Sequence, residues 1–362
     1  MKKNIIMFMP SIEGGGVEKN FFIVSNYLIN FHHVSVITIS HKYKKKFNKK
    51  IRFLTYNLEL LDKLSRRFKY FLALILLIKE IINSKNMLVF CFQANIYTTI
   101  VCKLFNIKII VRSNSAPVGW SKNYFKKKIF SKVLNFADKI VVNSYEFKKD
   151  LKKEFKVNSK CIYNPLNKKE ILKKSKKKVK LIFKDKVLRI INVGRFVEQK
   201  DQLTLLKALN EVKNKIKFNA VLIGQGILKY ELNKYIEENK LQNHVKLFEF
   251  KENPFPYIKQ SDLFVLSSSY EGLPNVLLET LVLDRPIISS NCRTGPKEIL
   301  LNGKGGQLYE VGNYKQLAKL LIKFSKNKKK SLKKLKFAKK NLDRFDFNRN
   351  LKKYLYLVKS LT

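Results

Sequence analysis

Residues 267–279 read Ser-Ser-Ser-Tyr-Glu-Gly-Leu-Pro-Asn-Val-Leu-Leu-Glu, and the apolar run 262–266 comes directly before them. A short apolar run bounded by small polar residues is typical of a buried parallel strand. The apolar side chains of residues 276–282 then fall on one face of a helix. The stretch therefore predicts a strand, a turn and a helix, with Glu271 in the turn and Glu279 about one helical turn in.

The start of this helix suits an anionic ligand. Pro274 fits a first helical turn, where its missing N–H needs no partner, and Asn275 lies beside the free amides of that turn. Helix starts of this kind bind anions. A single Glu in such a place is more often a solvated loop acid or an ordinary surface residue, but the joint context of Glu271 and Glu279 favours a binding site.

A second element, Gly194-Arg195-Phe196-Val197-Glu198-Gln199-Lys200, follows the apolar run 188–193 and precedes a predicted helix. A cation pair at the end of a strand suits a pyrophosphate, because each charge-assisted contact contributes about 1.5–3 kcal/mol. In a chain with 75 Lys and Arg residues, ordinary surface charge is the competing interpretation. The spacing between Gly194, Arg195 and Lys200, and their place after a strand, single these residues out.

With these two elements in order, together with the glycine-rich turn 14–16 and the turn Gly224-Gln225-Gly226, nearly the whole chain resembles family 4 of the retaining nucleotide-sugar glycosyltransferases. The resemblance implies the α/β fold called GT-B, in which two Rossmann-like domains face each other and the C-terminal helix crosses back to the first domain. The segment Thr294 to Leu300 is similar to the bacterial subgroup that adds sugars to polyprenyl-diphosphate-linked glycans.

The resemblance also implies roles for residues. Retention of configuration would proceed by front-face displacement, with Arg195 and Lys200 stabilising the leaving diphosphate, Glu271 binding hydroxyls of the donor sugar and Glu279 the ribose diol. It implies further donor or acceptor contacts, largely through the backbone, at Gly15, Gly16, Gly194, Gly224, Gly226, Phe250, Lys251, Gly272, Leu273, Pro274 and Asn275.

Two features set limits on the resemblance. Many members of the family place a His near residues 112–117, whereas none of His32, His33, His41 and His244 matches, so Asn114 or Arg112 would take over that sugar contact. No DxD pair stands in a suitable loop, since Asp343 and Asp346 have the wrong spacing. We therefore expect no metal held by protein ligands.

Length and pattern agree with two domains. A chain of 362 residues exceeds the usual size of one core. We expect a first domain over residues 1–166, a Lys-rich linker over 167–187, a nucleotide-sugar-binding domain over 188–344 and a returning helix over 345–362. In the first domain, Lys19 occupies the third glycine position of the dinucleotide fingerprint and no acid ends the second strand, which argues against NAD. The three glycines alone are also compatible with a simple tight turn.

The net charge of +48 leaves other function classes open. One is a basic protein that binds nucleic acid or an anionic membrane without catalysis. The lysines are spread along the chain without a stripe interleaved with aromatic residues, which argues against specific nucleic-acid binding, and coding bias explains part of the excess. A phosphorylase or a nucleotide-sugar epimerase on the same fold is another alternative.

Location follows from the apolar runs and the cysteines. The run 5–9 is too short for a signal peptide, and the nine residues Tyr70 to Ile78 fall short of the roughly 20 that cross a bilayer. The run is expected to be a buried helix, with an interfacial helix as the alternative. The four cysteines form no CxxC pair.

Taken together, these features predict a cytoplasmic enzyme, peripheral on the inner face of the cell membrane, that transfers hexosyl groups in surface polysaccharide or glycoconjugate assembly. Its donor is expected to be a UDP-N-acetylhexosamine or UDP-hexose, with a GDP-hexose left open, and its acceptor a polyprenyl-diphosphate-linked or other glycan. Acceptor and sugar specificity is expected in loops 12–16, 93–97 and 113–120.

Overall fold

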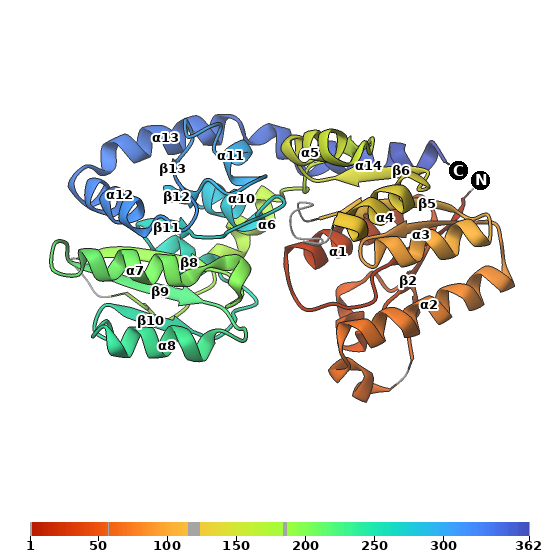
Figure 1. The fold of residues 1–362 in the computed structure, drawn as a ribbon, viewed down its shortest axis with the longest axis horizontal. Coiled ribbons are helices and arrows are strands. Elements are labelled where there is room, and N and C mark those ends of the chain that lie inside the picture. The colour runs from red at the N-terminus through yellow and green to blue at the C-terminus, as the bar shows by residue number, and fades with distance from the viewer. Residues whose placement is uncertain (1, 57, 115–123, 184–186, 362) are drawn as a thin grey trace. The chain divides into compact units, whose positions relative to one another are not determined.

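A computed structural model describes residues 2–56, 58–114, 124–183 and 187–361 of the chain (Figure 1). The backbone divides into two compact units. Unit 1 comprises residues 1–165 together with 347–362, and unit 2 comprises residues 166–346. Part of the predicted specificity loop 113–120, residues 115–120, and residues 184–186 of the predicted linker lie outside the described residues.

The described part of unit 1 contains a seven-stranded parallel sheet in the order β3-β2-β1-β4-β5-β6-β7. The strand order reverses between β1 and β4, and β1 pairs along its full length with β2 on one side and with β4 on the other. The central strands β1 and β4 are runs of buried apolar residues, as a sheet covered on both faces requires. The strands are β1 (Asn4–Phe8), β2 (His33–Ile37), β3 (Arg52–Leu54), β4 (Met87–Cys91), β5 (Lys108–Ser113), β6 (Lys139–Val142) and β7 (Lys160–Cys161).

Helices cover both faces of this sheet. Apolar residues of α2 (Arg66–Asn83), α3 (Asn95–Leu104), α4 (Tyr124–Asn135) and α5 (Tyr145–Phe155) join one core cluster with one face. Residues of α1 (Gly16–Leu28) and of the last helix, α14 (Phe347–Lys359), join the core on the other face. Helix α14 therefore returns to the first unit, as the fold class predicted.

The described part of unit 2 contains a six-stranded parallel sheet in the order β10-β9-β8-β11-β12-β13. Here the order reverses between β8 and β11. The strands are β8 (Leu188–Val193), β9 (Phe218–Ile223), β10 (Val245–Phe248), β11 (Leu263–Leu266), β12 (Ile287–Ser290) and β13 (Gln307–Tyr309).

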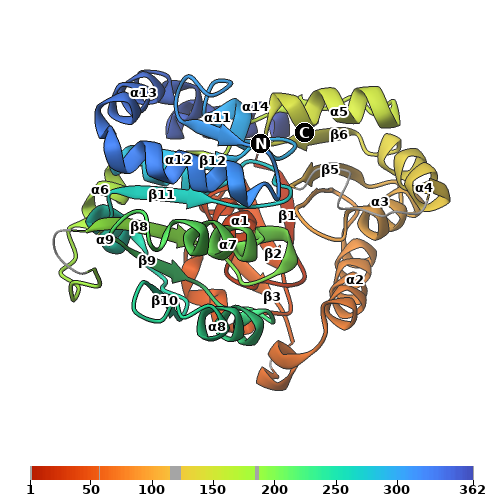
Figure 2. The same ribbon diagram turned by 60° about the vertical axis from the view of Figure 1, so that its left-hand side comes forward.

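Helices also cover both faces of the second sheet. One core cluster joins the strands to α7 (Gln202–Val212), α8 (Lys229–Glu238) and α12 (Tyr314–Lys326) (Figure 2). Helices α6 (Lys168–Ser175), α9 (Phe255–Gln260) and α10 (Asn275–Val282) pack against one another, and α11 (Pro296–Ile299) and α13 (Lys328–Lys340) complete the unit. Helix α6 lies within the stretch predicted as a linker, yet it packs in unit 2, where the Asn253 side chain donates to the Lys174 carbonyl at 2.9 Å.

Candidate active site

The two sequence elements that carry the candidate acids and bases meet at the point where the strand order of unit 2 reverses. All strands are parallel, so the loop after β8 and the loop after β11 leave the same edge of the sheet. The Ser269 amide donates to the Gln199 carbonyl at 2.9 Å, and the Ser267 hydroxyl donates to the Lys200 carbonyl at 2.9 Å. Ligands of open α/β sheets bind at this kind of strand reversal.

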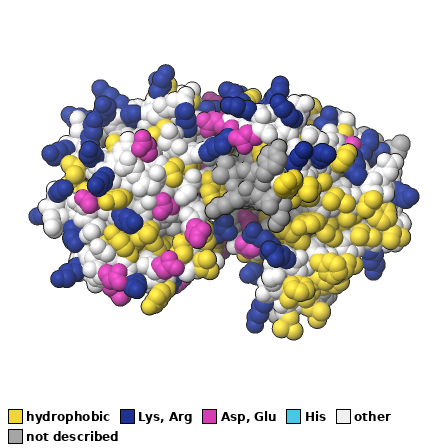
Figure 3. All heavy atoms as spheres, viewed as in Figure 1, with side chains coloured by type: hydrophobic (Ala, Val, Ile, Leu, Met, Phe, Trp, Pro, Cys, Tyr) yellow, Lys and Arg dark blue, Asp and Glu magenta, His cyan; other side chains and the backbone are white. Residues whose placement is uncertain are grey.

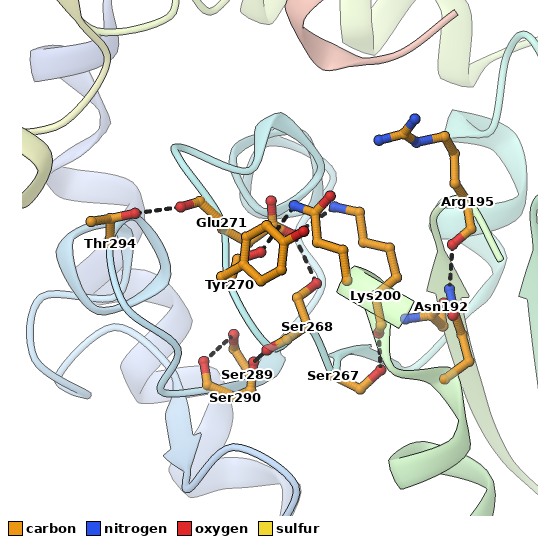
Figure 4. Close-up of polar contacts among 12 residues, drawn as sticks. Asn192, Arg195, Lys200, Ser267, Ser268, Tyr270, Glu271, Ser289, Ser290 and Thr294 are labelled. Carbon is orange, nitrogen blue, oxygen red and sulfur yellow. Dashed lines mark hydrogen bonds and ion pairs between the residues drawn. The ribbon is translucent and has the colours of Figure 1, made fainter. Parts of the chain in front are cut away.

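Lys200 and Glu271 form an ion pair at this reversal (Figure 4). The Lys200 Nζ lies 2.5 Å from Glu271 Oε1, and the Ser268 hydroxyl donates to the same oxygen at 2.7 Å. The Glu271 side chain is 7% exposed and the Lys200 side chain 18%. The carboxylate is thus enclosed by its own donors, while the ammonium keeps some access to solvent and to a ligand.

The loop after β12 supports Glu271 from behind. The Thr294 hydroxyl donates to the Glu271 carbonyl, and the Ser290 hydroxyl donates to the Ser268 carbonyl at 2.6 Å. Gly295 has φ +83°, and a Cβ there would lie 2.3 Å from the Gly272 carbonyl oxygen. Sequence reasoning used Thr294 and Gly295 only as a subgroup marker and missed this support, although a Thr-Gly-Pro turn after a strand was a signal.

The glycines of the two turns before this site allow their backbones to approach closely. A Cβ at Gly224 would lie 2.0 Å from the Gly194 carbonyl oxygen, and one at Gly226, whose φ is +155°, would lie 2.2 Å from the Phe196 carbonyl oxygen. The Phe196 amide donates to the Gln225 carbonyl at 2.8 Å. Gly224 and Gly226 therefore allow the turns that follow β8 and β9 to pack closely against each other.

Three other candidates lie at the same edge of the sheet. Arg195 follows β8 with an exposed side chain, and Figure 4 shows it to one side of the Lys200–Glu271 pair. Its carbonyl accepts from the Gln202 side chain at 2.9 Å. Phe250 is exposed and Lys251 half-buried, just after β10 ends at Phe248.

The helix after the site differs from expectation at its start. Pro274 has ψ 105° and is the cap residue, so it precedes the first helical turn, and the prediction that it lies within that turn is wrong. The helix begins at Asn275, because the extended backbone of Pro274 is needed to turn the chain out of the loop. Gly272 and Leu273 are buried in that loop. Glu279 is 8% exposed, which excludes the interpretation that it is an ordinary surface acid.

The glycine-rich turn of unit 1 lies beside that unit's own strand reversal. The Ser11 amide, after β1, donates to the Gln93 side chain, after β4, at 2.9 Å. The Glu18 carboxylate accepts from the Gly15 amide at 2.9 Å, and Gly16 begins helix α1. The single N–H of Gly15 is therefore already used within the chain, and the negative charge of the Glu18 carboxylate beside it disfavours a phosphate at this turn.

The two residues expected to replace the missing histidine have different surroundings. Arg112 is fully buried and donates to the Tyr354 hydroxyl at 2.9 Å and to the Asn164 side chain at 2.6 Å. The expectation that Arg112 contacts the sugar is therefore wrong, because the guanidinium is committed to the core of unit 1. Asn114 is half-buried and donates to the Phe92 carbonyl at 3.1 Å.

The buried cysteines Cys91 and Cys292 are not candidates for nucleophilic chemistry. All four are free thiols. Burial, with the Glu271 charge as a second cause, raises the pKa of Cys292 to about 12, and burial raises the pKa of Cys91 to about 12. Both thiols therefore stay protonated near neutral pH. Among the described residues, no three His, Cys, Asp or Glu side chains gather in a way that could hold a metal ion.

Comparison with known proteins shows what this geometry is similar to. Residues 173–341, nearly all of unit 2, match the protein family described as glycosyl transferases group 1. Unit 2 is therefore similar to the group 1 glycosyl transferases. This confirms the resemblance drawn from the sequence motifs.

Two curated relatives of this chain are informative. An uncharacterized glycosyltransferase of Methanocaldococcus jannaschii is 35% identical over 217 residues, which cover 54% of this chain and only 53% of that protein. The N-acetylgalactosamine-N,N'-diacetylbacillosaminyl-diphospho-undecaprenol 4-alpha-N-acetylgalactosaminyltransferase of Campylobacter jejuni is 29% identical over 272 residues, which cover 72% of this chain and 73% of that protein.

Solved structures extend the likeness in fold to both units of the chain. HepE of Anabaena in complex with UDP has a TM-score of 0.78 at 16% identity, covering 99% of this chain and all of that one. The same protein in complex with UDP-glucose has a TM-score of 0.79 at 16% identity, with the same coverage. Together with the two parallel sheets, these likenesses confirm the GT-B fold class.

Proposed function

We propose that this chain is a retaining glycosyltransferase that moves a hexose or N-acetylhexosamine from a UDP-linked donor to a polyprenyl-diphosphate-linked glycan. The observation that carries the proposal is the enclosed Lys200–Glu271 pair at the strand reversal of unit 2. The UDP and UDP-glucose complexes of the Anabaena protein support the donor class. The name of the Campylobacter relative supports the acceptor class.

The proposed reaction breaks the bond between the anomeric carbon and the diphosphate and forms a bond from that carbon to the acceptor oxygen on the same face. The acceptor hydroxyl gives its proton to the leaving diphosphate. Negative charge grows on the diphosphate as the bond breaks, so a cation already held in place lowers the barrier without reorganising. Lys200 fits this role because Glu271 fixes its ammonium at 2.5 Å, and Arg195 is the second candidate cation.

Glu271 has a supporting role in this proposal. Its Oε1 already accepts from Lys200 and from Ser268, and its side chain is buried. We assign it to the orientation of Lys200 first, with contacts to sugar hydroxyls made through its remaining acceptor capacity. Glu279 stays the candidate for the ribose diol, and Phe250 and Lys251 stay candidates for the base.

The location of the enzyme is part of the same proposal. None of the described helices combines the length and apolar character needed to cross a bilayer. A polyprenyl-linked acceptor is confined to a membrane, so we propose peripheral association with the inner face of the cell membrane. The net charge of +48 favours that anionic surface.

The first experiment is titration calorimetry of the full chain with UDP and with GDP at about 0.5 M salt, where the Debye length of a few ångströms screens nonspecific phosphate attraction. We expect saturable binding that prefers UDP and is weakened at least about tenfold by Glu279→Ala, since a carboxylate bonded to a ribose diol is lost. The matched control is Glu238→Ala, which removes an exposed acid from α8 of the same unit.

Three results would count against the proposal. Absence of saturable binding would favour a charge-driven binder without catalysis. Equal weakening by Glu238→Ala would show a general loss of integrity of unit 2 and not the loss of a specific Glu279 contact, because removing an acid raises the net positive charge and cannot by itself weaken binding of an anion. Product analysis with a UDP-sugar separates the remaining alternatives, because a phosphorylase releases a sugar phosphate and an epimerase releases an epimer, whereas a transferase forms a glycoside.

A further inference from the structure

Unit 1 carries an exposed apolar face on three neighbouring helices. Figure 3 shows hydrophobic side chains gathered over α2, α3 and α4, and α3 packs against both α2 and α4. The side chains that form it are between 41% and 79% exposed. We call these residues the outer face: Phe68, Phe71, Ile75 and Ile82 on α2; Tyr97, Ile100 and Leu104 on α3; and Phe125 and Ile129 on α4.

The outer face follows helical spacing and lies opposite the core. On α2 its members recur at intervals of three, four and seven residues, which is one stripe of a helix. The apolar residues of α2 buried in the core of unit 1 are Ala73, Leu77 and Ile81, which at 100° per residue lie about 150° from that stripe. Helix α2 therefore has one apolar side that completes the fold and a second that faces solvent.

The charges on the same helices are almost all positive. Lys79 lies on the stripe of α2, and Lys128 and Lys132 are exposed at the same spacing on α4. Within the described ranges of α2, α3 and α4, the sole carboxylate is Glu80, and it is bonded to Arg52 at 2.8 Å. An apolar stripe with lysines and aromatic residues is the pattern of a helix that lies in a membrane interface.

We propose that the outer face seats unit 1 on an anionic lipid surface, with the aromatic and aliphatic side chains among the acyl chains and the lysines at the headgroups. A contiguous apolar patch on a soluble protein marks an interaction site. Charge decides the occupant, because a second copy of this chain would place the same lysines against each other. The stripe is available without local unfolding, since the opposite side of α2 stays in the core.

This inference rests on the peripheral membrane association of the proposed function and deepens it, because it names the surface that makes the contact. The test is flotation of the full chain with vesicles of phosphatidylcholine alone and with vesicles containing about 30% phosphatidylglycerol, at about 0.15 M salt. We expect binding to the anionic vesicles only. UDP binding, measured by calorimetry for each variant, serves as the check of folding and keeps failure of docking separate from failure of the proposed function.

The first pair of variants tests the apolar part. Phe68→Ser with Phe71→Ser is expected to weaken binding to the anionic vesicles about a hundredfold, from the transfer of two large side chains. The matched control, Tyr230→Ser with Phe337→Ser, removes two exposed aromatic residues from unit 2 and is expected to change binding less than about twofold.

The second pair tests the charge. The triple variant Lys79→Glu, Lys128→Glu and Lys132→Glu is expected to abolish flotation. Each replaced lysine should lower the affinity for anionic vesicles about fivefold or more. Lys329→Glu with Lys330→Glu and Lys333→Glu makes the same change in net charge on α13, where all three lysines are exposed. Equal losses from the two sets, or equal losses from the two aromatic pairs, would overturn the proposal, as would binding to neutral vesicles or self-association through the outer face.

Discussion

Replacing Lys200 separates its proposed catalytic role from its structural one. Lys200→Met keeps the aliphatic stem of the side chain and removes its ammonium group. The Glu271 carboxylate, which is 7% exposed, then loses the ion pair with Lys200 and keeps the hydrogen bond from the Ser268 hydroxyl. Breaking an enclosed ion pair costs about 3–5 kcal/mol. For a unit of this size that lowers the melting temperature by roughly 10 °C, and loss of one held cation lowers kcat about 10²- to 10³-fold.

Glu271→Gln and the double variant complete the comparison. A glutamine oxygen still accepts from Lys200 and Ser268, so we expect Glu271→Gln alone to cost less stability than Lys200→Met. In the double variant no buried charge is left unpaired, so most of the lost stability returns. Turnover does not return, because the cation that faces the diphosphate is absent.

The assay is a double-mutant cycle, read both as thermal unfolding and as turnover of a UDP-sugar donor. Coupling between the two positions in stability without matching coupling in kcat supports the reasoning. If the double variant recovers turnover to within about tenfold of Glu271→Gln, then Lys200 only neutralises Glu271, and the proposed role in stabilising the leaving group is refuted.

Three further outcomes follow from contacts described above. Gly295→Ala places a Cβ 2.3 Å from a neighbouring carbonyl oxygen, so we expect a fall in turnover and in the melting temperature of unit 2. Asp262→Asn removes a carboxylate with a lowered pKa. Burial by itself would raise the pKa of Asp262, but hydrogen bonds from Arg189 outweigh burial and hold that pKa below its usual value. That pair stabilises the fold above about pH 4 and its contribution is lost as pH falls through the lowered pKa, so urea unfolding of wild type and variant should differ most near pH 7 and converge in acid. Tyr354→Phe removes the acceptor of the buried Arg112, and we expect a loss of about 1.5–3 kcal/mol that raises hydrogen exchange in unit 1.

Two of these outcomes have a matched control variant. Tyr356→Phe changes an exposed tyrosine on the same helix as Tyr354 and should leave exchange unaltered. Gly312→Ala substitutes another glycine of positive φ, at a place where a Cβ would meet nothing within 4 Å. Gly312→Ala therefore introduces backbone strain without a clash with a neighbouring carbonyl. A loss of turnover in Gly312→Ala as large as that in Gly295→Ala would contradict the reasoning. A stability difference for Asp262→Asn that persists in acid would contradict the assigned pKa.

The apolar runs 188–193 and 262–266 correctly predicted β8 and β11, which are inner strands of unit 2. Residues 188–193 form β8 as expected, because a strand buried on both faces is a continuous apolar run that needs no knowledge of its neighbours. The short strands β3, β7 and β13 were not predicted. They have three, two and three residues at the edges of the sheets, and pairing with a distant strand, not local composition, defines them.

The candidate site shows the same division. Motif spacing identified Lys200 and Glu271, yet their contact spans 71 positions and exists because β11 pairs beside β8. Spacing alone could not show that Thr294 supports Glu271 from a third strand. Arg112 was misjudged for a similar reason, since its partner Tyr354 lies 242 positions further along the chain. The roles of the site residues toward a substrate remain predictions.

The return of α14 makes unit 1 discontinuous in sequence, with the whole of unit 2 inserted between Pro165 and Phe347. During synthesis the ribosome delivers the complete unit 2 before the residues that finish the core of unit 1. Leu351, Tyr354 and Val358 belong to that core, so one face of the first sheet must wait with only α1 to cover part of it, and Arg112 must wait without its tyrosine partner. Unit 1 is therefore the first unit to be started and the last to be completed. Its first segment, residues 1–165, is the part of the nascent chain that stays exposed to chaperones and proteases for longest.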